Sequence, residues 1–225
     1  MQVGEHWVVI TRKRIKNLYL RVREPSQVEV SAPRHWPEKD IRALVAARSE
    51  WIKEKQQKLA RRPQPKTLSY CSGELLPYAG DHYRLIITKA RQHNRVELKA
   101  GELHLALTRA DDAMACQAAI ERWYRQQLKP RIAELLAQWQ PIMRVQASDF
   151  GVRKMKTRWG SCNIRTQKIW LNLELVTKHP ECLEYVVVHE LTHLYERYHN
   201  ARFYALMDQF LPDWRTRRER LNNCD

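Results

Sequence analysis

The chain has 225 residues, a hydrophobic content of 44% and a formal net charge of +15 at pH 7. A chain of this length can hold one large domain or two small ones with a proper core. No apolar run approaches the roughly 18 residues of a membrane span, and the N-terminus lacks the apolar block and small-residue cleavage site of a signal peptide. The sequence therefore predicts no membrane association, and we expect a cytoplasmic protein.

The cysteines are odd in number and scattered, and no C-x-x-C pair occurs among them: Cys71, Cys116, Cys162, Cys182 and Cys224. Such a pattern indicates neither a disulfide framework nor a structural zinc cluster. A small buried hydrophobe is the expected role for Cys162.

The positive charge is concentrated near the N-terminus. Residues 1–66 hold 16 Lys and Arg against 7 Asp and Glu, whereas residues 67–149 hold 11 against 9 and residues 150–225 hold 13 against 9. This bias would favour salt-sensitive, sequence-independent association with nucleic acid or another polyanion. No nucleic-acid motif accompanies it, so a well-solvated surface is the simpler interpretation.

The first elements are predicted to be strands and one helix. Residues 7–32 alternate as short strands do, with a turn at 24–27, and predict a small antiparallel sheet. Residues 37–62 follow a helical pattern with Ile41, Val45 and Ile52 on the apolar side. The prolines of residues 63–66 predict a stiff break.

Strand signals return over residues 67–108, where Ala100-Gly101 marks a hairpin. No catalytic constellation occurs in this half, and its lone histidines are interpreted as ordinary surface or strand residues: His35, His82, His93 and His104. We therefore predict that residues 1–109 form a strand-rich region with one long helix.

The second half begins with a helix that Asp111 or Asp112 can cap and that runs to about residue 139. Pro130 is expected to kink or split this helix. Two strand signals follow, separated by a polar turn at 163–167. Another helix then completes an α+β arrangement, a small sheet backed by helices with an edge strand beside that last helix.

The last helix carries H-E-x-x-H, the motif of zinc hydrolases. His189 and His193 are four residues apart, so on a helix they lie on one face and can bind one metal ion together. Glu190 points away from the first coordination shell and is placed to act as general base on a metal-bound water. Pro180 at the helix start and an apolar stripe through Leu183, Val187, Leu191 and Leu194 support the helix.

A catalytic zinc normally has three protein ligands and one open position. His199 follows His193 by six residues, the interval of the longer H-E-x-x-H-x-x-G-x-x-H signature, although Glu196 stands where that signature has Gly. An unbroken helix would point His199 away, so the chain must leave the helix before it. Glu196 is a rival ligand that better suits the second shell, and Asp208 and Asp213 are further rivals.

These residues resemble a known family. The run KMKTRWGSC (154–162), LNLEL, YVVVHELTHL, the H-x-x-x-F of residues 199–203 and PDW at 212–214 are together similar to the YgjP-like (DUF45, WLM-related) metal-dependent hydrolases. The resemblance extends over essentially the whole chain and implies a zincin-like fold for residues 110–225. It also implies one Zn²⁺ per chain, held by His189, His193 and His199, with Glu190 as the catalytic acid/base.

Four further residues are candidates for second-shell or substrate-binding roles: Arg158, Trp159, Glu196 and Asn172. Arg158 could orient a substrate carbonyl or carboxylate, and Trp159 is interpreted first as a core anchor. Ser161 and Cys162 are not predicted to be nucleophiles, because no base is fixed next to them.

We therefore expect a zinc metallopeptidase that acts on a peptide or protein substrate. The alternatives are a metal-dependent hydrolase of a nucleotide or other phosphoanhydride, and a basic nucleic-acid-associated protein with a structural metal.

Overall fold

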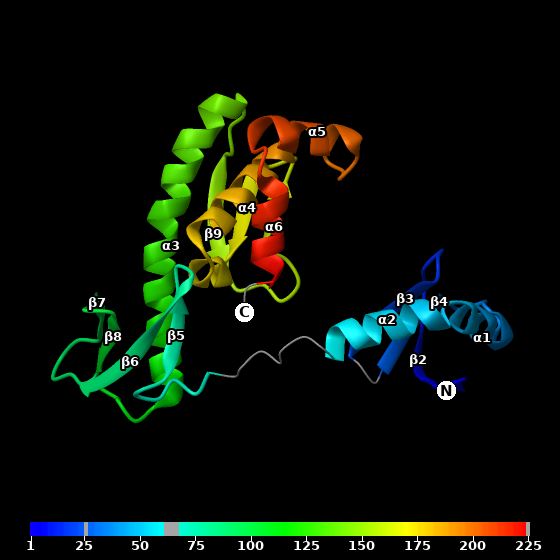
Figure 1. Ribbon diagram of the computed structural model, residues 1–225, viewed down its shortest axis with the longest axis horizontal. Helices are drawn as coiled ribbons and strands as arrows, with labels where there is room; N and C mark the ends of the chain where they lie inside the picture. Colours follow the sequence, from blue (N-terminus) through cyan, green and yellow to red (C-terminus); the bar gives the residue numbers. More distant parts are fainter. Residues whose placement is uncertain (25–26, 61–67, 224–225) are drawn as a thin grey trace. The chain divides into compact units, whose positions relative to one another are not determined.

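The computed structural model describes residues 1–24, 27–60 and 68–223. The chain divides into two compact units, unit 1 (Met1–Lys66) and unit 2 (Thr67–Cys224). Each unit combines strands with helices and has its own hydrophobic core. The predicted α+β class is therefore confirmed (Figure 1).

Unit 1 is a four-stranded sheet followed by two helices. The strands lie in the order β1-β2-β4-β3. One face of the sheet packs Val8, Val28 and Val30 against Ile41, Val45 and Ile52 of the helices. The elements are β1 (Gln2–Val3), β2 (His6–Lys13), β3 (Tyr19–Glu24), β4 (Gln27–Pro33), α1 (Glu38–Ala47) and α2 (Ser49–Ala60).

Strand direction in unit 1 differs from the prediction. β3 pairs antiparallel with β4, but β2 pairs parallel with β4, so the sheet is mixed and not antiparallel throughout. Alternation of apolar residues shows which face of a strand is buried, and it is the same for parallel and antiparallel neighbours. The predicted turn at 24–27 includes residues 25–26, which lie outside the described residues.

The predicted single helix of unit 1 is two helices. α1 ends at Ala47 and is capped by Arg48, whose N–H bonds to the carbonyls of Leu44 and Val45, and α2 starts at Ser49. Helical periodicity runs through this junction because Ile41, Val45 and Ile52 all face the sheet. The C-terminal end of the predicted helix and the break at 63–66 lie outside the described residues.

Unit 2 opens with a second sheet of the same design. Its strands lie in the order β5-β6-β8-β7, with the first and last pairs antiparallel and the central pair parallel, as in unit 1. The predicted turn at Ala100-Gly101 is confirmed, since both residues have positive φ, 49° and 80°. The strands are β5 (Leu75–Tyr78), β6 (Asp81–Lys89), β7 (Arg95–Lys99) and β8 (Glu102–Leu107).

The long helix α3 (Ala113–Met143) connects this sheet to the rest of unit 2 (Figure 1). Asp112 caps it, as predicted, by accepting hydrogen bonds from the N–H groups of Met114 and Ala115. The helix continues through Pro130 without splitting. Leu103 and Leu105 of β8 share one buried core with Ile120 and Ile132 of α3.

The position of the division along the chain therefore differs from the predicted one at 109/110. Strands β5 to β8 belong to the C-terminal unit, because their apolar face is covered by a helix that comes after them in sequence.

The remaining elements of unit 2 frame the predicted metal helix. A three-stranded sheet has the order β10-β11-β9, which makes β10 an edge strand. β10 pairs antiparallel with β11, and β11 pairs parallel with β9. In the described part of the chain no helix is long and apolar enough to cross a membrane. The elements are β9 (Asp149–Arg153), β10 (Gly160–Asn163), β11 (Lys168–Asn172), the 3₁₀ helix η1 (Leu173–Thr177), α4 (Pro180–Thr192), α5 (Ala201–Phe210) and α6 (Trp214–Asn223).

Candidate metal centre

Helix α4 carries the H-E-x-x-H motif and is fixed by its apolar side. It starts at Pro180, whose fixed φ and missing N–H suit the first helical position. Leu183, Val187 and Leu191 are buried in the core of unit 2. Burial of this stripe holds the helix in one rotation about its axis, in which Glu190 lies against Gly160 of β10.

The chain leaves the helix directly after Thr192, as a third ligand at His199 requires. His193 is the C-terminal cap of α4, and Asn200 caps α5 by accepting a hydrogen bond from the N–H of Phe203 at 3.0 Å. In the segment 193–200 no residue has a positive φ. The exit thus needs no glycine, and Asn200 acts as a helix N-cap in an extended conformation.

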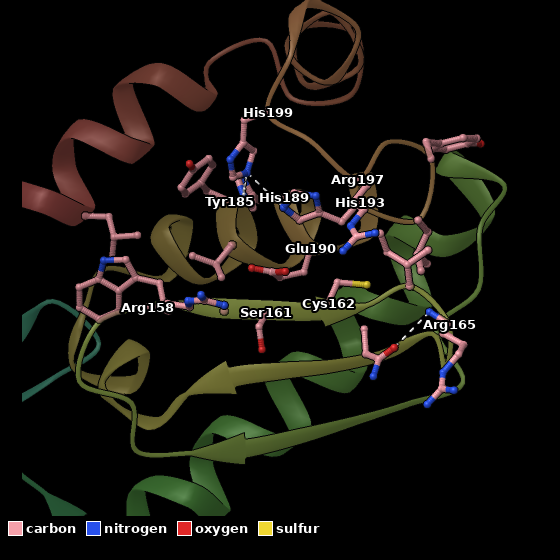
Figure 2. Close-up of a pocket in the computed structure, with 18 residues that line it drawn as sticks. Arg158, Ser161, Cys162, Arg165, Tyr185, His189, Glu190, His193, Arg197 and His199 are labelled. Carbon is pink, nitrogen blue, oxygen red and sulfur yellow. Dashed lines mark hydrogen bonds between the residues drawn. The ribbon is translucent and has the colours of Figure 1, made fainter. Parts of the chain in front are cut away.

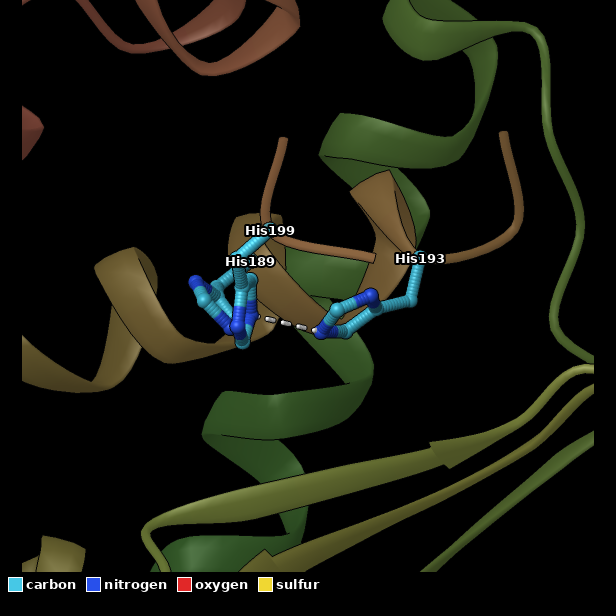
Figure 3. A group of neighbouring side chains, drawn as sticks. All are labelled: His189, His193 and His199. Atoms are coloured by element: carbon cyan, nitrogen blue, oxygen red, sulfur yellow. Dashed lines mark hydrogen bonds between the residues drawn. The ribbon is translucent and has the colours of Figure 1, made fainter. Parts of the chain in front are cut away.

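Three imidazoles meet at the end of this turn (Figure 3). Nε2 of His199 lies 3.0 Å from Nε2 of His189 and 3.1 Å from Nε2 of His193. The ring of Phe203 packs against all three, with centroid separations of 4.9, 4.8 and 4.7 Å. An apolar ring therefore backs the cluster and limits the positions that the imidazoles can take.

The tautomer of His193 is set by its hydrogen-bond partner. Its Nδ1 lies 3.1 Å from the backbone carbonyl of Glu196. A carbonyl only accepts hydrogen bonds, so Nδ1 carries the proton and Nε2 presents a lone pair to the centre. Histidine ligands of metals are typically oriented in this way.

These donors fit a zinc ion. Nitrogens bound tetrahedrally at about 2.0–2.1 Å from zinc lie about 3.3–3.4 Å apart, close to the separations found here. Burial, and then the neighbouring positive charges, lower the pKa of His189 to about 3. Burial likewise lowers the pKa values of His193 and His199. All three rings are therefore neutral at pH 7, as metal ligands must be.

Glu190 lies beside the cluster as a buried carboxylate. It is 4% exposed, and its Oε2 has no hydrogen-bond partner. Burial raises its pKa to about 8, against a lowering by the positive charge of Arg158. An orphaned carboxylate oxygen next to three converging imidazoles is what a metal-bound water would satisfy.

Gly160 makes room for this carboxylate. A Cβ added at residue 160 would lie 2.5 Å from Oε1 of Glu190 and 2.8 Å from its Cγ. Only glycine allows β10 and Glu190 to approach this closely. The glycine of the RWGSC run is thus explained by the position of Glu190.

The centre opens into a cleft of about 1140 Å³ between α4 and β10 (Figure 2). Arg158, Ser161, Cys162, Arg165 and Arg197 line it together with the metal-site residues. Burial, and secondarily the charge of Glu190, raise the pKa of the Cys162 thiol to about 11. This thiol is therefore protonated and unsuited to be a nucleophile at neutral pH.

The side chain of Asn172 is used entirely inside the protein. It accepts from the N–H groups of Met155 and Glu174 and donates to the carbonyls of Met155 and Arg158. Asn172 therefore holds the segment that leads into β10. Trp159 packs against the core of unit 2, and Lys178 lies 6.0 Å from its ring centroid.

The acidic rivals to His199 are engaged elsewhere. Asp208 pairs with Arg215 and accepts from the indole N–H of Trp214 at 2.8 Å. Asp213 pairs with Arg217 at 2.8 Å. The carboxylate of Glu196 accepts from the N–H of Tyr198, and its backbone carbonyl contacts Nδ1 of His193.

Sequence reasoning did not single out several residues of this cleft. Tyr185 lies edge-on to His189 and stacks on Trp214. Arg165 and Arg197 lie in the loops after β10 and α4. Position i−4 to His189 on a helix indicates Tyr185 directly, whereas the loop arginines carry no sequence signal that separates them from other surface arginines.

The chain is similar to a known protein family. No curated protein sequence matches the chain. Among solved structures, the metallopeptidase zymogen of Pyrococcus abyssi abylysin matches with 21% identity and a TM-score of 0.37, over 40% of this chain and 90% of that one. A family model, YgjP-like, metallopeptidase domain, matches residues 16–224. Because that match extends over nearly the whole sequence, the chain belongs to the YgjP-like metallopeptidase family.

Proposed function

We propose that this protein is a zinc-dependent hydrolase that cleaves peptide bonds, with one zinc ion per chain. The observation that carries the proposal is the convergence of His189, His193 and His199 beside the unpartnered carboxylate of Glu190. Three neutral imidazoles and one open position are the ligand set of a catalytic zinc. Membership of a metallopeptidase family supports the same chemistry.

The zinc ion, when bound, would polarise a substrate carbonyl and lower the pKa of a water molecule. Glu190 is the residue that moves the proton. Its carboxylate would take a proton at Oε2, the oxygen without a hydrogen-bond partner, and return it to the departing amine. Burial keeps competing solvent from the same oxygen.

The edge strand β10 provides the binding surface for the substrate in this proposal. It pairs with β11 on one side only, and it lines the cleft beside Glu190. An extended peptide can add to such an edge through main-chain hydrogen bonds. The open edge of β10 therefore supports a peptide substrate, because a small molecule would not use the strand edge.

A cleavage assay tests the proposal. The zinc-loaded full chain is incubated with a peptide library and, in parallel, with a nucleotide panel, and products are identified by mass spectrometry. We expect peptide cleavage that a chelator abolishes. Glu190→Gln should lower turnover by about 100- to 10,000-fold, because the variant cannot accept the proton.

The zinc content of Glu190→Gln serves as the control, and it should equal that of the wild type. Hydrolysis of nucleotides without any peptide cleavage would replace this function with the phosphoanhydride alternative. Full activity of Glu190→Gln would exclude the proposed role of Glu190.

A further inference from the structure

We propose that the cleft selects acidic peptides, and that Arg158 and Arg165 are the residues that recognise their carboxylates. This inference rests on the proposed peptidase function and names its substrate class. Three observations support it: the cleft is lined mainly by positive charges, its arginines form no ion pairs with carboxylates among the described residues, and these arginines are spread along β10.

The charge of the cleft is strongly one-sided. Within the described residues, its lining contains three arginines, Arg158, Arg165 and Arg197, and a single acidic residue, Glu190, which is buried beside the imidazoles. A bound zinc ion would add further positive charge. A cleft lined by one sign of charge attracts ligands of the opposite sign.

The cleft arginines are free to bind a ligand. In the described ranges, none of Arg158, Arg165 and Arg197 forms an ion pair with a carboxylate. Arginines on the nearby helix α6 behave differently, since Arg215, Arg217 and Arg220 pair with Asp208, Glu184 and Glu181. Acids are thus available in this unit, yet among the described residues only the buried Glu190 lines the cleft.

The arginines are spread along the cleft. Arg158 precedes β10 and Arg165 comes after it, so the strand separates them, and Figure 2 shows them at opposite ends of the strand with Glu190 between. A phosphate chain would call for arginines gathered at one point, whereas an extended peptide presents side chains on both sides of its scissile bond. The placement therefore favours a peptide with acidic residues flanking that bond.

Binding to the inactive full chain tests this inference independently of catalysis. Zinc-loaded Glu190→Gln is titrated with fluorescent peptides that carry Asp or Glu around a central apolar pair, and with matched peptides in which these residues are Asn or Gln. We expect the acidic peptides to bind about tenfold more tightly, with a preference that weakens as salt is added.

Adding Arg158→Gln or Arg165→Gln to this background should weaken the binding of acidic peptides by about three- to tenfold and leave the neutral ones unchanged. Arg91→Gln removes the same charge from an exposed loop of unit 2 between β6 and β7, and it should change neither. Equal affinity for both peptide sets would overturn the inference, as would tighter arginine-dependent binding of a nucleoside triphosphate. Acid-selective binding without any peptide cleavage would leave the inference standing and remove the proposed function.

Discussion

The position of the Glu190 side chain depends on Gly160, a neighbour that has no side chain. The carboxylate lies against β10 at Gly160, where even a methyl group would meet Oε1 at 2.5 Å. Because Glu190 is buried, it has little freedom to move aside without leaving its place beside the imidazoles. Gly160 therefore acts as a positioning residue for the proposed base.

Gly160→Ala should displace Glu190 and lower kcat for the cleaved peptide by about 100-fold, since misplacement by about 1 Å can have such an effect. Zinc content should change little, because the three atoms nearest to the added methyl group all belong to Glu190 and none to the imidazoles. Ser161→Ala, the next residue of the same strand, adds no volume and is the matched control. Steady-state kinetics of both variants give the measurement. Wild-type turnover in Gly160→Ala would show that the position of Glu190 does not depend on a glycine at residue 160.

The histidine pKa values predict how zinc binding responds to pH. All three are lowered from the ordinary 6.5, mainly by burial, and that of His189 reaches about 3. Protons therefore compete with zinc only below pH 6.5. The stability that these neutral rings contribute is likewise fully present above 6.5, and it is lost as the pH falls toward the lower folded-state values.

We expect the zinc affinity to be nearly constant between about pH 8 and pH 6.5 and to fall below that range. Competition with a zinc indicator, corrected for the protonation of the indicator, measures it. A steep fall that begins above pH 7 would mean that a ligand histidine titrates at its ordinary pKa or higher.

Among the elements, the segment before β10 depends on one buried amide. Asn172 forms four hydrogen bonds that tie residues 155–158 and the start of η1 to the end of β11. The residue is only 4% exposed, so no group of a substrate can replace these bonds. The amide of Asn172 thus holds the segment that leads into β10 in position.

Asn172→Ala should lower the free energy of unfolding by about 2–4 kcal/mol, because buried polar groups of the backbone lose their partners. Asn94→Ala, which removes an exposed amide that bonds to the N–H of Thr108, should cost about 1 kcal/mol or less. Urea denaturation of both variants compares the two. Equal effects would show that the segment before β10 holds its position without Asn172.

At this scale the sequence predicted element types well and pairing poorly. The Asp112 cap, the turn at Ala100-Gly101 and the start of α4 at Pro180 arise from local chemistry, and all three occur. The parallel pairing of β2 with β4 and the continuity of α3 through Pro130 depend on partners that are distant in sequence. The same holds for the loop arginines, which only the fold brings to the cleft.

The whole molecule contains one sheet design twice. Unit 1 and the first part of unit 2 share the strand order, the strand directions and a helix that comes after the sheet and covers it. The two cores share no residue, and every group of the metal centre belongs to unit 2. The predicted division at 109/110 grouped strands β5 to β8 with the strands of unit 1, because all of them show the same strand pattern in the sequence. In the structure β5 to β8 share a core with the long helix α3 instead.

A fragment of residues 67–225 should therefore fold, melt cooperatively and bind zinc as the full chain does. Circular dichroism and metal analysis of the fragment, compared with the full chain, test this. Residues 1–66 form a small core, so their fragment should be folded but only marginally stable. An unfolded 67–225 fragment would mean that unit 2 needs residues 1–66 in order to fold.

Metal analysis of purified variants tests whether His189, His193 and His199 bind a single zinc ion. Wild-type protein dialysed against zinc without chelator should retain about one ion per chain, and His199→Ala should lose it. Glu196→Ala should retain zinc, because it keeps the backbone carbonyl that orients His193. Wild-type protein without zinc, or loss of zinc in Glu196→Ala but not in His199→Ala, would contradict the three-histidine centre.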